Sequence, residues 1–194
     1  MILEPTMVGH QSLHKAGILH RDISINNVLV NEEGNSGFLI DLDLAIKEER
    51  LDRSGAPNKT GTKVFMAIGA LFGEQHNCMH DLESFFWVLF WICIHYTGPN
   101  GTCREVEQYE RWNYVPTEEL ANSKKGIVSN QRDFTRTTEE HFSPYFHPLR
   151  PYVHKLCDLV FPNGQRREQV NEQVYDKMRK VLRESMDDPE VRAK

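Results

Sequence analysis

Residues 17–45 read GILHRDISINNVLVNEEGNSGFLIDLDLA, and this stretch decides the fold. Asp22 and Asn27 stand five positions apart near its start, and Asp41 and Asp43 stand near its end. Between these groups, NVLV and GFLI are short β-rich runs separated by NEEGNSG, whose Asn, Gly and Ser residues favour a turn. The sequence therefore predicts a β-hairpin with candidate site residues on both sides of it.

Helices are expected before and after this hairpin. Pro5 is placed to open a short helix, and Gly17 is placed to cap it. After a polar loop from Lys47 to Lys63, residues 80–96 are apolar on nearly every face, which is typical of a helix in the middle of a core. The expected fold class is α+β and mainly α-helical, with one short hairpin.

The C-terminal half is expected to hold two further helices. One is PYVHKLCDLVF, and the other spans 167–186, where five apolar residues recur at the helical period: Val170, Val174, Met178, Val181 and Leu182. The stretch before them, 98–144, is interpreted as polar and irregular, with Trp112 and Tyr114 as isolated anchors. No role follows for it from the sequence.

Composition limits the classes of protein to consider. With 194 residues, 39% hydrophobic and 26% charged, the chain is long enough for one sizeable core. A net charge of -5 without long Lys or Arg runs indicates no nucleic acid and no membrane surface, so small ligands or protein partners are expected. Four cysteines without C-x-x-C spacing, no secretory signal and no long apolar run favour an intracellular protein, cytoplasmic or nuclear.

Phosphoryl transfer is the chemistry that the side chains around the hairpin suit. It needs cations that neutralise the β- and γ-phosphates, and Mg²⁺ is held by carboxylate and amide oxygens. HRDISINN places an acid and an amide, Asp22 and Asn27, in this stretch, and Asp41 follows Asp22 by 19 positions. A lone HRD triplet carries little information, whereas loop, hairpin and acid in this order are specific.

The chain resembles the C-terminal lobe of a eukaryotic protein kinase, and more narrowly the fungal-type protein kinase (FunK1) family. The residues that carry the resemblance are GILHRDIS, LIDLDLA, GTKVFMA and HDLESFFWVLFWI, and DLES is also similar to casein kinase 1. The resemblance is strongest over residues 13–97. It implies one protein kinase-like domain over 1–194, with a catalytic loop at 20–27, a metal-binding motif at 41–43 and an activation segment at 41–69.

The same resemblance implies roles for individual residues. Asp22 is expected to be the catalytic base, and Asn27 and Asp41 to bind Mg²⁺ and so position ATP, with Asp43 as a candidate further metal ligand. Arg21 is expected to brace the activation segment, and Asp81 to tie the core helix to the catalytic loop. The implied reaction transfers the γ-phosphate of ATP to serine or threonine hydroxyls of a protein.

Several positions depart from the kinase pattern. The chain begins 21 residues before Asp22, so the N-terminal lobe, with its Gly-rich loop and phosphate-binding lysine, is expected to be absent. Ser24 stands where serine/threonine kinases carry a lysine. AIG at 67–69 replaces the A-P-E triplet, so the arginine that pairs with its Glu is expected to be altered as well. His76 and His80 have a spacing compatible with zinc but lack a fourth ligand.

Two alternatives therefore stay open. The first is a catalytically inactive pseudokinase fragment that acts as a binding module, which the missing upper lobe and the missing lysine favour. The second is a small-molecule phosphotransferase of the aminoglycoside or choline type, because such enzymes also use an H-x-D-x-x-x-x-N loop and often carry an acid at the position of Asp43. Substrate and oligomeric state do not follow from the sequence.

Overall fold

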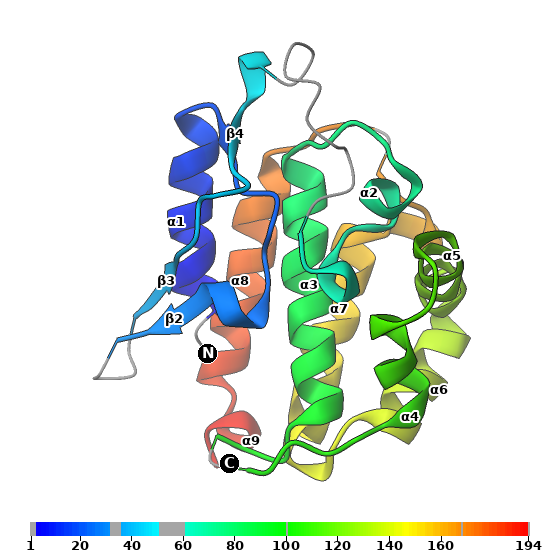
Figure 1. Cartoon of the computed structure of the whole chain (residues 1–194). Coiled ribbons are helices and arrows are strands. Elements are labelled where there is room, and N and C mark those ends of the chain that lie inside the picture. The colour runs from blue at the N-terminus through cyan, green and yellow to red at the C-terminus, as the bar shows by residue number, and fades with distance from the viewer. Residues whose placement is uncertain (1–2, 32–35, 51–60, 100, 168, 194) are drawn as a thin grey trace.

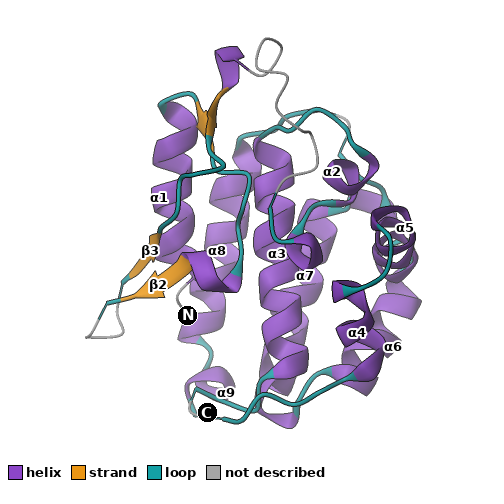
Figure 2. Cartoon of the chain, viewed as in Figure 1, coloured by secondary structure: helices purple, strands orange, loops and turns teal. Residues whose placement is uncertain are grey.

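The computed structural model describes residues 3–31, 36–50, 61–99, 101–167 and 169–193. Long helices pack side by side in an elongated bundle, and two small antiparallel sheets lie along one flank (Figure 1). Coloured by secondary structure, this part of the chain is dominated by helix (Figure 2). None of its helices is both long and apolar enough to cross a membrane. The prediction of a mainly helical domain with a short hairpin is confirmed.

Helix α1 (Leu3–Lys15) leads into the stretch that the sequence singled out. It buries a stripe at helical spacing that includes Leu3, Met7 and His10. Gly17 follows the helix with φ +71, a left-handed conformation that a residue without Cβ adopts at little cost. The predicted cap is therefore confirmed.

The two sheets join segments on either side of the candidate site. Strand β2 (Val28–Val30) pairs with β3 (Gly37–Leu39), which confirms the predicted hairpin. Strand β1 (Ile18–Leu19) pairs with β4 (Ile46–Lys47). The residues that enter loop 20–27 are thus hydrogen-bonded to those that follow Asp41 and Asp43.

Helix α3 (Cys78–His95) lies in the middle of the bundle, beside α7 (Arg150–Val160) (Figure 1). It begins slightly earlier than expected because Asn77 caps it: the Asn77 side chain accepts from the Met79 amide at 2.9 Å, and His80 accepts from the Asn77 amide at 3.1 Å. Most of its side chains are buried, as the sequence predicts.

The interpretation of 98–144 as irregular is wrong. This stretch forms α4 (Glu107–Glu110), α5 (Thr117–Val128) and α6 (Gln131–His141), which cover one side of α3 (Figure 1). The buried stripe of α5 contains a lysine, Lys124, and α6 buries only Phe134 and Thr138. Their apolar periodicity is therefore weak. Trp112 is buried, but Tyr114 is 83% exposed and anchors nothing.

The closing helices are confirmed with one correction. After α7, helix α8 (Gln173–Asp187) buries four of the five residues assigned to its apolar face: Val174, Met178, Val181 and Leu182. Val170 was the fifth, but it precedes the helix and is 52% exposed. A short helix, α9 (Pro189–Arg192), ends the described chain, and α2 (Ile68–Phe72) precedes α3.

Candidate functional site

Loop 20–27 is anchored to the core helix through Asp81, which is fully buried on α3. One carboxylate oxygen accepts the backbone N–H of His20 at 3.0 Å, and the other accepts that of Arg21 at 3.1 Å. Backbone donors in a loop are otherwise unpaired when buried, so these bonds fix the loop's conformation. The tie that the sequence predicts between Asp81 and the loop is present.

The Asp81 carboxylate accepts two further hydrogen bonds from imidazoles, from His10 at 2.8 Å and from His76 at 2.7 Å. Burial raises the pKa of Asp81, but the interaction with His76 and the bonds from both imidazoles outweigh burial and hold this pKa well below its ordinary value. His76 is thus occupied by Asp81, and His80 by the cap of α3. Both imidazoles are therefore used in contacts within the protein.

Asp22 follows this anchor with its carboxylate partly exposed. The Asn27 amide donates to the Asp22 carbonyl at 2.9 Å and to its Oδ2 at 3.0 Å, so the five-residue spacing in the sequence brings the two side chains together. The Asn27 Nδ2 is used in this way, which leaves its Oδ1 as the atom available to a cation.

The other Asp22 oxygen, Oδ1, is held by Thr62. It accepts the Thr62 backbone N–H at 2.7 Å and the Thr62 hydroxyl at 2.9 Å. Gly61 makes this approach possible: its φ is +103, and a Cβ placed there would lie 2.6 Å from the Arg21 carbonyl oxygen. Segment 61–68 is therefore packed directly against the Asp22 carboxylate.

The end of the hairpin is tied to the same loop. The buried His20 imidazole donates from Nε2 to the Ile40 carbonyl at 3.1 Å, and the Ile40 amide donates to the Asn27 carbonyl at 3.0 Å. Burial lowers the pKa of His20, although Asp81 opposes this shift, so the imidazole is neutral at neutral pH. These two bonds tie Ile40, the residue before Asp41, to loop 20–27.

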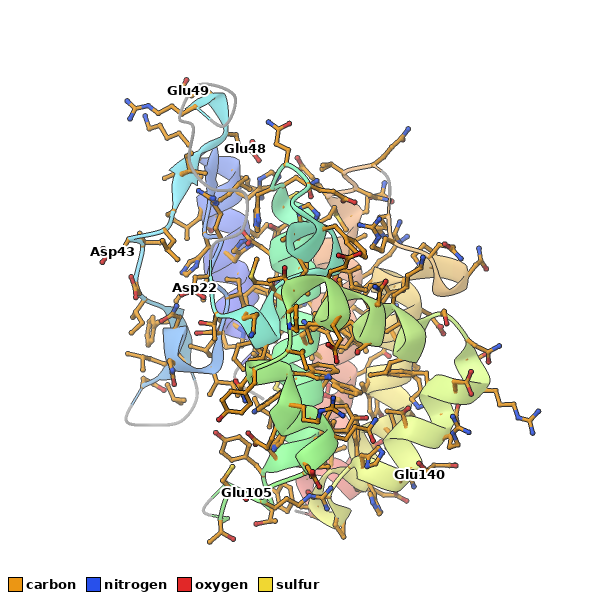
Figure 3. The ribbon with its side chains drawn as sticks, turned by 45° about the vertical axis from the view of Figure 1, so that its right-hand side comes forward. Asp22, Asp43, Glu48, Glu49, Glu105 and Glu140 are labelled. Atoms are coloured by element: carbon orange, nitrogen blue, oxygen red, sulfur yellow. The ribbon has the colours of Figure 1, made fainter. Side chains whose placement is uncertain are left out.

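Asp41 has a strained backbone, with φ 63, and Arg21 has φ 70. Left-handed backbone at a residue with a Cβ costs on the order of 1 kcal/mol, and such residues concentrate at functional sites. The Asp41 Oδ1 accepts the Asp43 amide at 3.2 Å. Asp43 projects outward from this flank, on the same side of the molecule as Asp22 (Figure 3).

These oxygen donors suit Mg²⁺. Asn27 Oδ1 and the exposed Asp41 carboxylate are hard ligands, and Mg²⁺ in phosphoryl-transfer sites takes only one or two carboxylates and completes its shell with water and phosphate oxygens. Within the described ranges, no three His, Cys, Asp or Glu side chains converge on an all-protein metal site. The arrangement therefore fits a cation shared with a phosphate ligand.

The surroundings of Ser24, Lys63 and Arg21 bear on whether these residues can bind a phosphate. Ser24 is buried, and its side chain carries no charge. Lys63, the neighbour of Thr62, donates to the Val115 carbonyl at 3.0 Å. Arg21 is buried, and burial lowers the pKa of its guanidinium while Asp81 opposes that shift. Residues 51–60, in the middle of the expected activation segment, lie outside the described residues.

The segment that follows AIG at 67–69 is tied to an arginine from a distant part of the chain. Arg166, which lies between α7 and α8, bonds the Glu74 carboxylate through its Nη1 at 2.6 Å. Because Glu74 lies just beyond α2, this ion pair joins the end of α2 to the segment between α7 and α8.

The outer face of the hairpin is apolar beside this polar site. Leu29 and Phe38 are cross-strand partners and are 46% and 50% exposed. Ile40, Leu42 and Leu44 continue the exposed apolar surface toward Asp41 and beyond. An apolar patch next to carboxylates indicates a site that a ligand or another protein segment covers.

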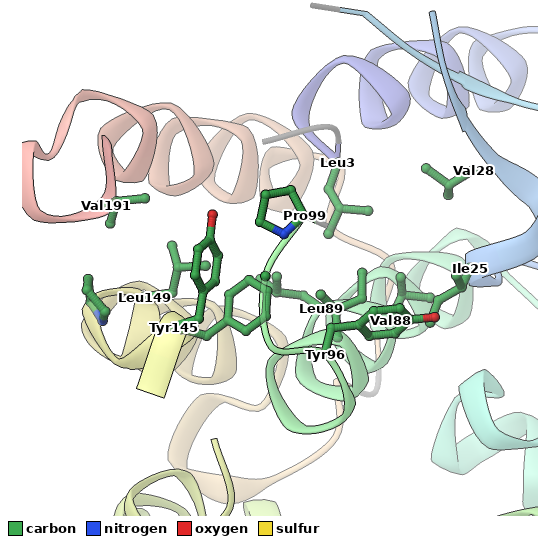
Figure 4. A pocket seen from close by; sticks show the side chains of 14 residues that line it. Leu3, Ile25, Val28, Val88, Leu89, Tyr96, Pro99, Tyr145, Leu149 and Val191 are labelled. Atoms are coloured by element: carbon green, nitrogen blue, oxygen red, sulfur yellow. The ribbon is translucent and has the colours of Figure 1, made fainter. Parts of the chain in front are cut away.

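A separate pocket of about 560 Å³ lies on the other side of loop 20–27 (Figure 4). Ile25 and Val28 contribute to its wall, together with residues of α3 such as Val88 and Leu89. None of the described residues that line it carries a charge at neutral pH. Its lining therefore offers no charge that would neutralise a phosphate.

Some contributors were not identified from the sequence. Neither Thr62 nor His10 was assigned a role at the site from the sequence. No local signal marks His10, because its partners Asp81 and Tyr175 lie 71 and 165 positions away. The GT pair at 61–62 carried a usable signal, since a glycine before a hydroxyl residue permits a close backbone approach.

Comparison with known proteins finds similarity to protein kinases. The model of the fungal protein kinase family matches residues 1–93. A putative protein kinase C delta type homolog of Drosophila melanogaster is 30% identical over 145 residues, covering 70% of this chain and 21% of that protein. A human dual serine/threonine and tyrosine protein kinase is 31% identical over 115 residues, covering 55% of the chain and 11% of that protein.

The chain thus spans about a fifth or less of the length of these relatives. The matched region contains loop 20–27, the hairpin, Asp41 and most of α3. Residues 1–93 match the model of the fungal protein kinase family, and the curated relatives that the chain resembles are protein kinases.

Proposed function

We propose that this chain is the C-terminal lobe of a protein kinase that transfers the γ-phosphate of ATP to serine or threonine hydroxyls of proteins. The observation that carries the proposal is the convergence of three segments: Asn27 and Thr62 both bond the Asp22 carboxylate, and the residue before Asp41 is tied to Asn27. Such a site can accept a proton and hold a cation within one small region.

Asp22 acts as the base in this proposal. Its carboxylate receives the proton of the attacking hydroxyl, while the bonds from Asn27 and Thr62 hold it in one orientation. Asn27 and Asp41 hold Mg²⁺, which supplies positive charge to the β- and γ-phosphates of ATP. Arg21 braces the activation segment, 41–69, and Asp43 is a further candidate ligand because its backbone is tied to Asp41.

The assignment to a C-terminal lobe rests on the mainly helical fold and on the exposed apolar face of Leu29, Phe38 and Ile40. In the proposal, this face is covered by the adenine ring and by a second lobe that closes over the phosphates. An intracellular location, cytoplasmic or nuclear, follows from the use of ATP, and a protein substrate follows from the kinase family match.

The inactive alternative has one observation in its favour, since the buried Ser24 provides no charge for the transferred phosphate. The decisive experiment measures transfer of phosphate from γ-labelled ATP to a protein acceptor, with the longest form of the protein recovered from native cells. Asp22→Asn is expected to abolish transfer and to leave the far-ultraviolet circular dichroism spectrum unchanged. Equal turnover by this variant overturns the base assignment, and binding of Mg·ATP without turnover favours the binding module.

The same assay separates the small-molecule alternative. Protein and aminoalcohol acceptors are offered in parallel, and only the protein is expected to be labelled. The close packing of segment 61–68 against Asp22 supports this expectation. Because this segment restricts access to the Asp22 carboxylate, an acceptor has to lie along segment 61–68 to reach it.

A further inference from the structure

Lys124 is fully buried on α5, which is unusual for an ammonium group. Its Nζ donates to the Met66 carbonyl at 2.7 Å and lies 4.5 Å from the centre of the Trp87 ring and 5.4 Å from that of Trp112. The lysine therefore reaches from α5 into the core and ends on the backbone of segment 61–68.

Glu83, also buried, reaches the same segment from α3. Its Oε1 accepts the Ile68 backbone N–H at 2.7 Å and the Trp87 indole N–H at 2.9 Å. Met66 and Ile68 are thus held by side chains of opposite charge from two different helices. Leaving a buried charge unpaired is costly, so the two side chains depend on each other.

The electrostatics agree with this geometry. Burial lowers the pKa of Lys124 to about 7, and the carboxylate of Glu83 opposes part of that shift. Burial raises the pKa of Glu83, against the hydrogen bonds from Trp87 and Ile68. A methionine or leucine would fill either position without these penalties, so packing alone does not require a charged pair.

The held segment is the one that touches Asp22. Thr62 lies four residues before Met66, and backbone hydrogen bonds from Phe65 to Thr62 at 2.9 Å and from Met66 to Lys63 at 3.2 Å connect the intervening turn. We propose that Lys124 and Glu83 are positioning residues: by holding the backbone at Met66 and Ile68, they keep Thr62 against the Asp22 carboxylate. The consequence for phosphoryl transfer rests on the proposed function, but the contact itself does not.

Amide hydrogen exchange measured by NMR on the 194-residue chain tests this role. The reporter is the Thr62 N–H, which donates to Asp22, and the reference amides are those of α8. Lys124→Met is expected to accelerate Thr62 exchange by about tenfold relative to the reference amides. The matched control is Lys125→Met, because Lys125 is exposed on the same helix. This variant is expected to leave the exchange rates of the Thr62 amide and of the reference amides unchanged.

A double variant, Lys124→Met with Glu83→Gln, separates positioning from stability. The double variant leaves no unpaired buried charge, so its free energy of global unfolding is expected to return toward that of the natural chain. Exchange of the Thr62 amide is expected to stay fast, because the bond from residue 124 to the Met66 carbonyl is still missing. This variant also carries the test if the single variant does not fold.

Two outcomes overturn the proposal. If exchange rises equally in all amides, or if the double variant recovers slow Thr62 exchange, Lys124 and Glu83 contribute only to the stability of the core. Because exchange needs neither ATP nor turnover, a chain without kinase activity gives the same result. Failure of the proposed function appears separately, in the phosphate-transfer assay with Asp22→Asn.

Discussion

The hydroxyl of Tyr175 donates to His10 Nδ1 at 2.7 Å, although the two residues stand 165 positions apart in the chain. The His10 Nε2 in turn donates to Asp81, which holds the backbone of loop 20–27. A continuous chain of buried hydrogen bonds therefore joins the C-terminal helix α8 to the candidate site, and its members can be tested one at a time.

Removal of the Tyr175 hydroxyl is expected to destabilise the whole domain. Tyr175→Phe leaves the His10 Nδ1 buried without a donor, and a loss of about 1–3 kcal/mol in the free energy of unfolding follows. Urea denaturation measures this loss. The control is Tyr152→Phe, which removes a bond to Asp188 in a partly exposed position and is expected to cost less. Equal losses for both variants contradict the chain of bonds.

Asp81→Asn is expected to loosen loop 20–27. The amide offers one acceptor oxygen where the carboxylate accepts four hydrogen bonds from backbone and imidazole donors, and breaking a buried charged network costs about 3–5 kcal/mol. Exchange of the His20 and Arg21 amides should accelerate more than that of α8. Asp176→Asn is the matched control, because its side chain is 75% exposed.

The Thr62 hydroxyl is expected to affect the rate of phosphate transfer. Thr62→Val removes one of the two Thr62 bonds to Asp22 Oδ1 and should lower kcat by about tenfold, whereas Thr62→Ser keeps the hydroxyl and should stay within about twofold of the natural rate. Steady-state kinetics with a protein acceptor provides the measurement. Equal rates for the Val and Ser variants exclude a role for the hydroxyl.

Asp41 and Asp43 are expected to differ in their effect on Mg²⁺. Asp41→Asn removes a proposed ligand and should raise the Mg²⁺ concentration needed for half-maximal ATP binding by about tenfold. Asp43→Asn is the matched variant from the same exposed turn. If it changes the Mg²⁺ concentration needed for half-maximal ATP binding only slightly, Asp43 does not ligate the ion. Calorimetric titration at several Mg²⁺ concentrations distinguishes them, and removal of Mg²⁺ with a chelator should abolish tight binding.

The buried Lys124 makes stability depend on pH. Because its pKa is about 7 in the folded chain and has an ordinary value of 10.5 when unfolded, the unfolded chain binds more protons between these values. The free energy of unfolding should therefore increase with pH across this window, with a limiting slope of about 1.4 kcal/mol per pH unit. Denaturant titrations compare the natural chain with Lys124→Met, which should lack this increment. If the free energy of unfolding depends on pH in the same way for the natural chain and for Lys124→Met, the prediction is wrong.

Local patterns account for the parts of the fold and site that the sequence predicts. The hairpin, the cap at Gly17 and the pairing of Asp22 with Asn27 depend on residues close together in the chain, and the apolar composition of residues 80–96 is sufficient to place α3 in the core. The tie between Asp81 and the loop was accessible because the kinase resemblance supplied a partner for that residue.

Contacts that depend on tertiary packing were not predictable from pattern. Helix α5 was missed because a lysine occupies its buried face, where Trp87 and a backbone carbonyl stabilise the charge. Val170 matched the period of α8 but lies before its first turn. The bond between Glu74 and Arg166 joins residues 92 positions apart, and no spacing rule indicates which carboxylate an arginine selects.

The bond between Tyr175 and His10 also bears on how the protein is made. Synthesis proceeds from the N-terminus, so loop 20–27 leaves the ribosome long before α8 exists, and its buried anchor stays incomplete until Tyr175 has emerged. The segment that carries Asp22 is therefore expected to be among the last parts of the nascent chain to become ordered. Released chains that end before residue 175 should remain sensitive to protease in that loop, and the released 194-residue chain should be resistant.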